Sequence, residues 1–239
     1  MLRIIDARTG AAVAAAPVRR GLTRVEAHAS GHGTGELRVL LVADLLVRAL
    51  ELGGTPVWGL LSCAGEQTRL RAAATALGIR PFEEGRDIGA GLGEAQVIHV
   101  AREGTDVPYG VLVAVAPVRD PAHPGDDDPA VLRLALLSHP RSTPVRLDAA
   151  VLGEARDTLV RWRKAVATWA RQPSRPVPEE VRGRLRAAWE DDLDVPEVLR
   201  VLRWVEQNPE VAPGARFETY AYADRLLGLD LTRDLGSPV

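Results

Sequence analysis

The chain has 239 residues, of which 46% are hydrophobic and 26% charged, and its formal net charge is −2. This balance is typical of a soluble globular protein with a sizeable core and excludes a largely disordered chain. No apolar run reaches membrane-spanning length and the N-terminus lacks a signal-peptide pattern, so a cytoplasmic protein without membrane contact is expected. The single cysteine, Cys63, excludes an internal disulfide and a multi-cysteine zinc site.

The first half of the chain alternates predicted strands and helices. Strands are expected at residues 2–6, 25–29, 55–61, 96–100 and 110–116, and helices at 37–52 and 67–77. Gly53 and Gly54 end the first helix, and residues 11–20 are interpreted as a connector. A strand, a helix and a further strand in this order form a parallel-sheet unit of the nucleotide-binding kind.

The second half changes character after residues 117–129, which hold four prolines and four aspartates and are interpreted as a linker. Its Asp126, Asp127 and Asp128 are interpreted as solvated rather than as magnesium ligands. Asp148 is expected to cap a helix that ends near Trp169, and further helices are expected at residues 178–189, 196–207 and 217–227. Residues 230–239 are expected to be a loosely held tail.

A glycine-rich loop, Ser-Gly-His-Gly-Thr-Gly-Glu at residues 30–36, lies between a predicted strand and helix. Glycines let the backbone approach a ligand, and the N–H groups of a helix's first turn favour an anion such as phosphate. The loop is therefore predicted to bind the phosphates of a nucleotide through His32, Gly33, Thr34 and Gly35. An alternative is a flexible turn in which Thr34 caps the helix.

Three further stretches suggest a family: residues 2–10 (LRIIDARTG), 128–144 (DPAVLRLALLSHPRSTP) and 189–199 (WEDDLDVPEVL). In this order, and together with the strand–loop–helix unit, they resemble the cysteinyl-tRNA synthetases of class I, to which the cysteine ligase of mycothiol synthesis is a near relative. The resemblance implies ATP as cofactor and an amino acid as ligand. It implies tRNA as a further partner, which the negative net charge does not support.

We therefore predict an α/β fold, with a Rossmann-like, class I synthetase-like parallel-sheet domain over residues 1–125 and an all-helical bundle domain over 126–239. In the family, an ATP-binding His-x-Gly-His-type signature would fall on residues 33–36, with His32 one residue early. Nothing matches the family's Lys-Met-Ser-Lys-Ser-type loop, because Lys164 is the only lysine. Arg133 or Arg141 is the expected substitute for its charge.

The family's zinc ligands are also missing, so zinc is not expected. His28 falls where the first cysteine ligand would be, and the other ligands have no counterpart. His28 and His32 could be a remnant metal pair, but no metal site is assigned on two histidines alone. Cys63 is expected to be a core thiol.

Two functions follow, with no catalytic residue assigned to either. The departures favour a truncated paralogue without full aminoacylation activity, which acts as a binding or interaction protein with a protein partner. The preserved strand–loop–helix unit favours the alternative, an ATP-dependent adenylate-forming ligase that activates cysteine or another small amino acid. Glu36, in the first helical turn, would repel phosphate and counts against tight ATP binding.

Overall fold

The computed structural model describes residues 1–17, 22–84, 94–119 and 128–236. The chain folds into two compact units, and both are discontinuous in sequence. The first unit comprises Met1–Pro121, Arg141–Arg146 and Glu190–Leu193, and the second comprises Ala122–Pro140, Leu147–Trp189 and Asp194–Val239. The predicted domain boundary between residues 125 and 126 lies outside the described residues.

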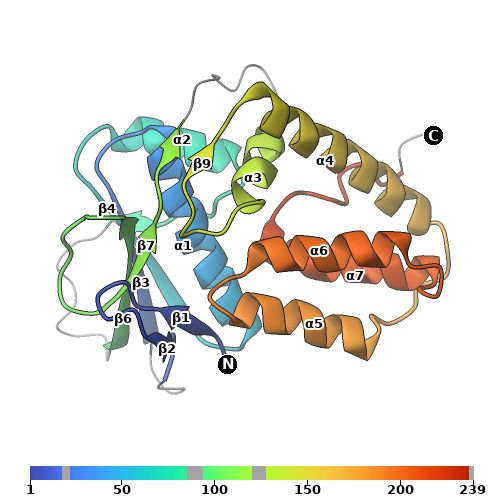
Figure 1. Ribbon diagram of the computed structural model, residues 1–239, viewed down its shortest axis with the longest axis horizontal. Coiled ribbons are helices and arrows are strands. Elements are labelled where there is room, and N and C mark those ends of the chain that lie inside the picture. Colours follow the sequence, from blue (N-terminus) through green and yellow to red (C-terminus); the bar gives the residue numbers. More distant parts are fainter. Residues whose placement is uncertain (18–21, 85–93, 120–127, 237–239) are drawn as a thin grey trace. The chain divides into compact units, whose positions relative to one another are not determined.

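The first unit contains a parallel sheet, as predicted, and this sheet has five strands (Figure 1). The strand predicted at residues 2–6 does not join it, and residues 83–84 add a strand that the sequence did not predict. Its strands are β3 (Leu22–Ala29), β4 (Val57–Cys63), β5 (Glu83–Glu84), β6 (Glu94–Arg102) and β7 (Val111–Val115). They lie in the order β5-β4-β3-β6-β7. The chain moves outward from β3 to β4 and β5 and then returns to the opposite side of β3 at β6, so the strand order reverses between β3 and β6.

Two helices of the first unit, α1 (Thr34–Leu52) and α2 (Gln67–Ala76), connect strands of the sheet. Helix α1 begins three residues before the predicted start, because Gly33 adopts the extended conformation of an N-cap, with φ −74° and ψ 176°. The proposed capping role of Thr34 is therefore wrong, since Thr34 is already the first helical residue. Gly54, with φ +80°, stops the helix where predicted.

A short antiparallel pair lies at the start of the chain, where β1 (Arg3–Ile5) pairs with β2 (Ala12–Ala14). The interpretation of residues 11–20 as a connector is wrong over β2. The Asp6 N–H donates to the Ala11 carbonyl at 2.9 Å, and Gly10 adopts φ +70° in the turn. Because the alanines of β2 have low strand propensity, the pairing of β2 with β1 could not be predicted from the sequence. The predicted linker contains a short strand, β8 (Val118–Arg119). It pairs in parallel with β9 (Val145–Arg146), which comes after the linker.

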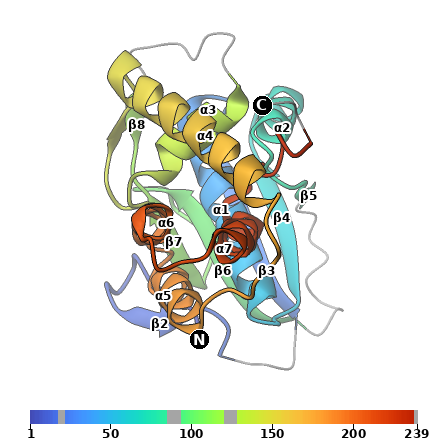
Figure 2. The ribbon, with the colours of Figure 1, turned by 90° about the vertical axis from the view of Figure 1, so that its right-hand side faces the viewer.

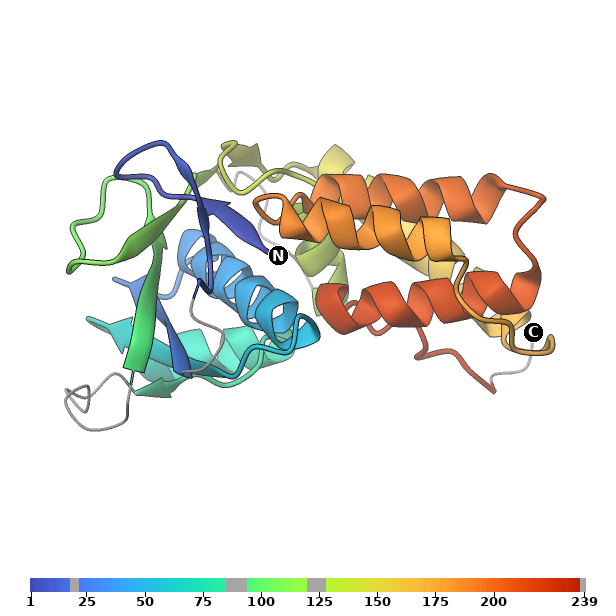
Figure 3. The same ribbon diagram turned by 90° about the horizontal axis from the view of Figure 1, so that it is seen from below.

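The second unit is built from helices, as predicted. They are α3 (Pro129–Leu137), α4 (Ala149–Trp169), α5 (Glu179–Glu190, whose last residue belongs to the first unit), α6 (Val195–Gln207) and α7 (Pro213–Leu227). Helix α3 packs on α4 (Figure 2), and α7 packs on both α4 and α6 (Figure 3). Asp148 caps α4 as predicted, because its Oδ1 accepts from the Val151 N–H at 3.1 Å. The rings of Trp162 and Trp169 pack edgewise on Tyr220 in the core.

Asp128 and the C-terminal residues are more firmly held than the sequence suggested. Asp128 caps α3 and accepts from Arg163 Nη1 at 2.6 Å, while Arg163 also donates to the carbonyls of Leu229 and Asp230. Asp128 is therefore not a solvated linker carboxylate. The prediction of a loose tail is wrong over residues 230–233, where Leu231 is buried and Arg233 pairs with Asp128. Asp126 and Asp127 lie outside the described residues.

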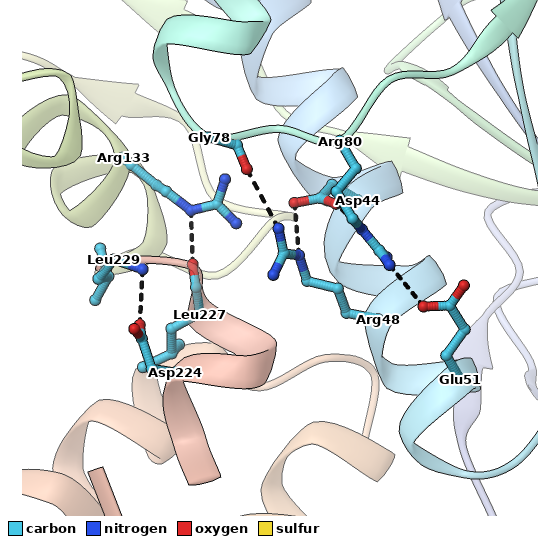
Figure 4. Close-up of polar contacts among 9 residues, drawn as sticks. All are labelled: Asp44, Arg48, Glu51, Gly78, Arg80, Arg133, Asp224, Leu227 and Leu229. Carbon is cyan, nitrogen blue, oxygen red and sulfur yellow. Dashed lines mark hydrogen bonds and ion pairs between the residues drawn. The ribbon is translucent and has the colours of Figure 1, made fainter. Parts of the chain in front are cut away.

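Each unit also contains a network of charged side chains (Figure 4). In the first unit, the fully buried Asp44 accepts from Arg48 at 2.9 Å and from Arg80 at 3.0 Å. In the second unit, Asp224 accepts from the Leu229 N–H at 2.7 Å and so fixes the chain after α7. Among the described residues, no helix combines the length and the apolar character needed to span a membrane.

Candidate functional site

A pocket of about 400 Å³ lies where β3, β4 and β6 of the first unit end. It is lined by His28, Ala29, Ser30, Ser62, Cys63, Ala64, Arg102 and Thr105. In open parallel sheets, ligands bind outside the carboxyl ends of the strands, at the point where the strand order reverses. The pocket occupies that position, which makes it the candidate ligand site of the chain.

The predicted phosphate-binding loop borders this site. Gly33 provides no side-chain cap, so the N–H groups of the first turn of α1 are not capped by the side chain of the N-cap residue. An added Cβ at Gly35 would lie 3.9 Å from Nε of Arg102, which places this arginine beside the start of α1. The assignment of Gly33, Thr34 and Gly35 to a nucleotide phosphate thus stays a prediction. The structure adds that the positively charged Arg102 lies beside this loop.

His32, the remaining predicted phosphate-binding residue, points to a different partner. Its Nδ1 lies 3.5 Å from Oε2 of Glu66, and both side chains are about half exposed. Glu66 is the N-cap residue of α2, and His32 is not among the residues that line the pocket. The phosphate-binding role of His32 remains a prediction without a supporting contact.

Arg102 is the functional candidate that the sequence reasoning missed. Its Nη1 donates to Oε1 of Glu36 at 3.0 Å, so the acid expected to repel phosphate has an adjacent counter-charge. The guanidinium is half exposed, whereas the Glu36 side chain is buried. The available signal was the position of Arg102 at the carboxyl end of a predicted strand, where ligand-binding side chains of parallel sheets gather.

The two arginines expected to replace the missing lysine are used in structural contacts. Arg133 is completely buried in the second unit, and its Nε donates to the Leu227 carbonyl at 2.6 Å (Figure 4). Arg141 is buried in the first unit, where it donates to the Ala114 carbonyl at 2.8 Å and pairs with Asp192. The expectation that either supplies the lysine's charge is therefore not supported by their contacts.

A second group of polar side chains lies next to the pocket. Nε2 of His28 is 2.9 Å from Nδ1 of His99, and the carboxylate of Glu26 lies 3.9 Å from the former and 3.8 Å from the latter nitrogen. Strand alternation puts Glu26 and His28 on one face of β3, and the sheet register sets His99 opposite Glu26. The suggested His28–His32 pair has no supporting contact, because His28 contacts His99 and His32 lies beside Glu66.

The electrostatics of this group favour neutral imidazoles. Burial lowers the pKa of both histidines, and the negative charge of Glu26 only partly opposes that effect. His99 is almost completely buried, while His28 reaches the wall of the pocket. Both rings therefore have an unprotonated nitrogen available as a hydrogen-bond acceptor or ligand at neutral pH.

Cys63 is not the core thiol that was expected. It ends β4 half-buried and lines the pocket. Partial burial raises the pKa of the Cys63 thiol, with the nearby Arg71 acting in the opposite direction. The protonated thiol is thus the dominant form at neutral pH, so Cys63 is a pocket-wall residue without an activated thiolate.

No protein-family model matches the chain. The chain is similar to L-cysteine:1D-myo-inositol 2-amino-2-deoxy-α-D-glucopyranoside ligases from several organisms. The ligase of Streptosporangium roseum is 36% identical over 126 residues, which are 51% of this chain and 29% of that protein. The ligase of Kytococcus sedentarius is 37% identical over a match of 137 residues, which covers 51% of this chain and 30% of that protein. The ligase of Parafrankia sp. is 38% identical over 113 residues, and this match covers 44% of this chain and 24% of that protein.

The fold and these similarities define the class to which the chain is related. A Rossmann-like parallel sheet followed by helices is the architecture implied by the resemblance to class I synthetases. Within that class, the chain is distantly and partially similar to a cysteine ligase. The matched stretch amounts to less than a third of each of these relatives.

Proposed function

We propose that the chain acts as an ATP-dependent, adenylate-forming ligase that activates cysteine or another small amino acid. The observation that carries this proposal is the position of the N-terminus of α1, whose N-cap residue is a glycine, beside Arg102 at the point where the order of the parallel strands reverses. The relatives support it because they are named as ligases of L-cysteine.

The chemistry requires a place for negative charge. In adenylate formation, a carboxylate oxygen of the amino acid attacks the α-phosphorus of ATP, and pyrophosphate leaves with the bonding electrons. The N–H groups and the dipole of α1 would bind phosphate oxygens, and Arg102 would offset the charge of Glu36. Ser30, Ser62 and Thr105 line the pocket, and their hydroxyl groups would offer hydrogen bonds to the bound ligand.

A second candidate function is binding of a nucleotide or aminoacyl adenylate without turnover, in the service of a protein partner. This function is favoured because the described residues that line the pocket offer no free positive charge that could stabilise pyrophosphate as it leaves. The only lysine of the chain, Lys164, lies on α4, and the charge of Arg102 is already matched by Glu36. Such a site would hold a ligand but would stabilise the departing pyrophosphate poorly.

One pair of measurements separates the two functions. Exchange of radiolabelled pyrophosphate into ATP is measured with each amino acid, and calorimetry measures binding of ATP and of a non-hydrolysable cysteinyl-adenylate analogue. Exchange that depends on cysteine or another small amino acid supports the ligase. Binding of the analogue with no exchange for any amino acid supports the second function, and absence of both exchange and binding contradicts both.

A further inference from the structure

The side chains of Glu26, His28 and His99 form a compact set of potential metal ligands in the first unit. One ligand atom from each lies within 4.8 Å of the others. The two ring nitrogens are 2.9 Å apart, Oε2 of Glu26 lies 3.8 Å from that of His99, and Oε1 lies 3.9 Å from that of His28. Donor atoms about 2.1 Å from one ion are roughly 3.0–3.4 Å apart in octahedral or tetrahedral geometry. The observed separations bracket that range, so small side-chain rotations would suffice to surround an ion.

The ring of His99 is held in the orientation that a ligand requires. Its Nε2 lies 3.4 Å from the Tyr109 carbonyl oxygen, which accepts the ring proton and leaves Nδ1 with a lone pair directed at His28. Metal-bound histidines usually donate their other N–H to such a carbonyl. Gly110, with φ +145°, allows this arrangement, because an added Cβ would lie only 3.1 Å from Cδ2 of His99.

The two facing nitrogens also leave a place for a cation. Without an ion, Nε2 of His28 has to carry a proton for the 2.9 Å contact to be a hydrogen bond, because Nδ1 of His99 has the lone pair. This proton lies between the two ring nitrogens and near the carboxylate of Glu26. Both ligand nitrogens belong to neutral imidazoles, the form in which histidine binds metals. A divalent ion would replace the proton and be partly balanced by Glu26.

Although the sequence predicted no zinc site, we infer that Glu26, His28 and His99 bind a divalent transition-metal ion, with Zn²⁺ as the best match. Two imidazoles and one carboxylate form a ligand set that Zn²⁺ uses when it keeps a coordination position open. Because His28 lines the pocket, the open position would face it. A water molecule or an anionic group of a pocket ligand would fill that position. The inference does not depend on the proposed ligase activity.

Cobalt binding tests this site directly. The full-length chain is freed of metal with a chelator and titrated with Co²⁺, whose visible d–d absorption reports the coordination geometry. One Co²⁺ per chain, displaced by Zn²⁺, is expected. The His28→Gln and Glu26→Gln variants should bind at least about tenfold more weakly, because each lacks one of three protein ligands. The matched control is His32→Gln, which alters a half-exposed histidine four residues away that is also near a glutamate and should bind as the wild type does.

A variant that fails to fold would not decide the question, so a second readout is included. Zn²⁺ should raise the melting temperature of the wild type and of His32→Gln equally and that of His28→Gln by clearly less at the same concentration. Equal Co²⁺ affinity of the wild type and both ligand variants would overturn the inference. An intense thiolate-to-cobalt band that disappears in Cys63→Ser would also overturn it, because sulfur would then be a ligand.

Discussion

At the scale of single residues, two opposite charges, those of Glu36 and Arg102, lie at the start of α1 and have opposite effects on the binding of an anion. Glu36 repels a phosphate there, and Arg102 attracts it. The pair makes the proposed nucleotide site testable without touching the fold elsewhere. Each partner can be neutralised separately, and the predicted changes in affinity have opposite directions.

We predict that Arg102→Gln weakens ATP binding about tenfold or more, since a hydrogen bond to a charged group contributes about 1.5–3 kcal/mol. Glu36→Gln should instead tighten binding. Calorimetric titration with ATP measures both. Arg69→Gln is the control, because Arg69 is 71% exposed and pairs with Glu66 on α2. Similar losses in Arg102→Gln and Arg69→Gln would argue against a phosphate site at α1.

The buried histidines predict a pH dependence of stability. Burial lowers the pKa of His28 and His99 below 6.5. At His99 the charge of His28 and, to a smaller extent, that of Arg24 add to this effect, while Glu26 acts against it at both histidines. Below pH 6.5 the unfolded chain therefore binds more protons than the folded chain. The free energy of unfolding should be at its full value above that pH. It should fall on acidification by up to about 1.4 kcal/mol per pH unit for each histidine.

Urea unfolding at a series of pH values, with a chelator present, measures this dependence. His28→Gln should flatten the profile between pH 6.5 and the lowered pKa values, because one of the two groups is gone. His32→Gln should leave it unchanged. A profile that is equally steep in the His28→Gln variant would show that other groups govern the acid limb.

At the scale of elements, local signals in the sequence fix where several helices begin. Asp148 is an example, since its carboxylate satisfies the Val151 N–H at the start of the 21-residue helix α4. Asp148→Ala should lower the free energy of unfolding by about 1 kcal/mol. Urea denaturation measures the loss. Asp157→Ala, an exposed change within the same helix, should cost little by comparison, and equal losses would contradict the capping role.

Two glycines on different elements should respond oppositely to alanine. An added Cβ at Gly59 in β4 would lie 3.0 Å from the Phe82 ring, so Gly59→Ala should destabilise by about 1–3 kcal/mol through overpacking. At Gly153 in α4 nothing lies within 4 Å of the added Cβ, so alanine should stabilise the helix by up to about 1 kcal/mol. Thermal melting of both variants checks the opposite signs, and a stabilised Gly59→Ala would contradict the packing described.

At the scale of the whole molecule, the first unit depends on segments that come much later in the chain. The buried Arg38 donates to the Ala116 carbonyl at 2.8 Å and to the Thr143 carbonyl at 2.9 Å. The Ile5 N–H donates to Asp192 at 2.8 Å, and Arg141 pairs with the same carboxylate. These contacts connect residues 51 to 187 positions apart within one compact unit.

A fragment of residues 1–125 is therefore expected to melt at a lower temperature than the first unit does within the full chain. It lacks β9, Arg141 and Asp192, which leaves buried donors such as Arg38 without part of their acceptors. Circular dichroism melting compares the two. Arg141→Ala in the full chain should cause part of the same loss. A fragment as stable as the intact chain would show that the later segments contribute nothing.

The sequence by itself determined the type of fold and the place of the glycine loop, because these depend on local patterns. Alternating apolar residues marked the strands, glycines marked the end of α1, and Asp148 marked the start of α4. The similarity to cysteine ligases was also visible in short linear stretches.

Only the tertiary structure decided which side chains share a site. The contact of His28 with His99 and that of Glu36 with Arg102 join residues 71 and 66 positions apart. Such contacts depend on strand order and on the register between β3 and β6, which no local pattern encodes. For the same reason Arg133 and Arg141, plausible by charge alone, proved to be structural, while Arg102 was recognised only once β6 was placed beside β3.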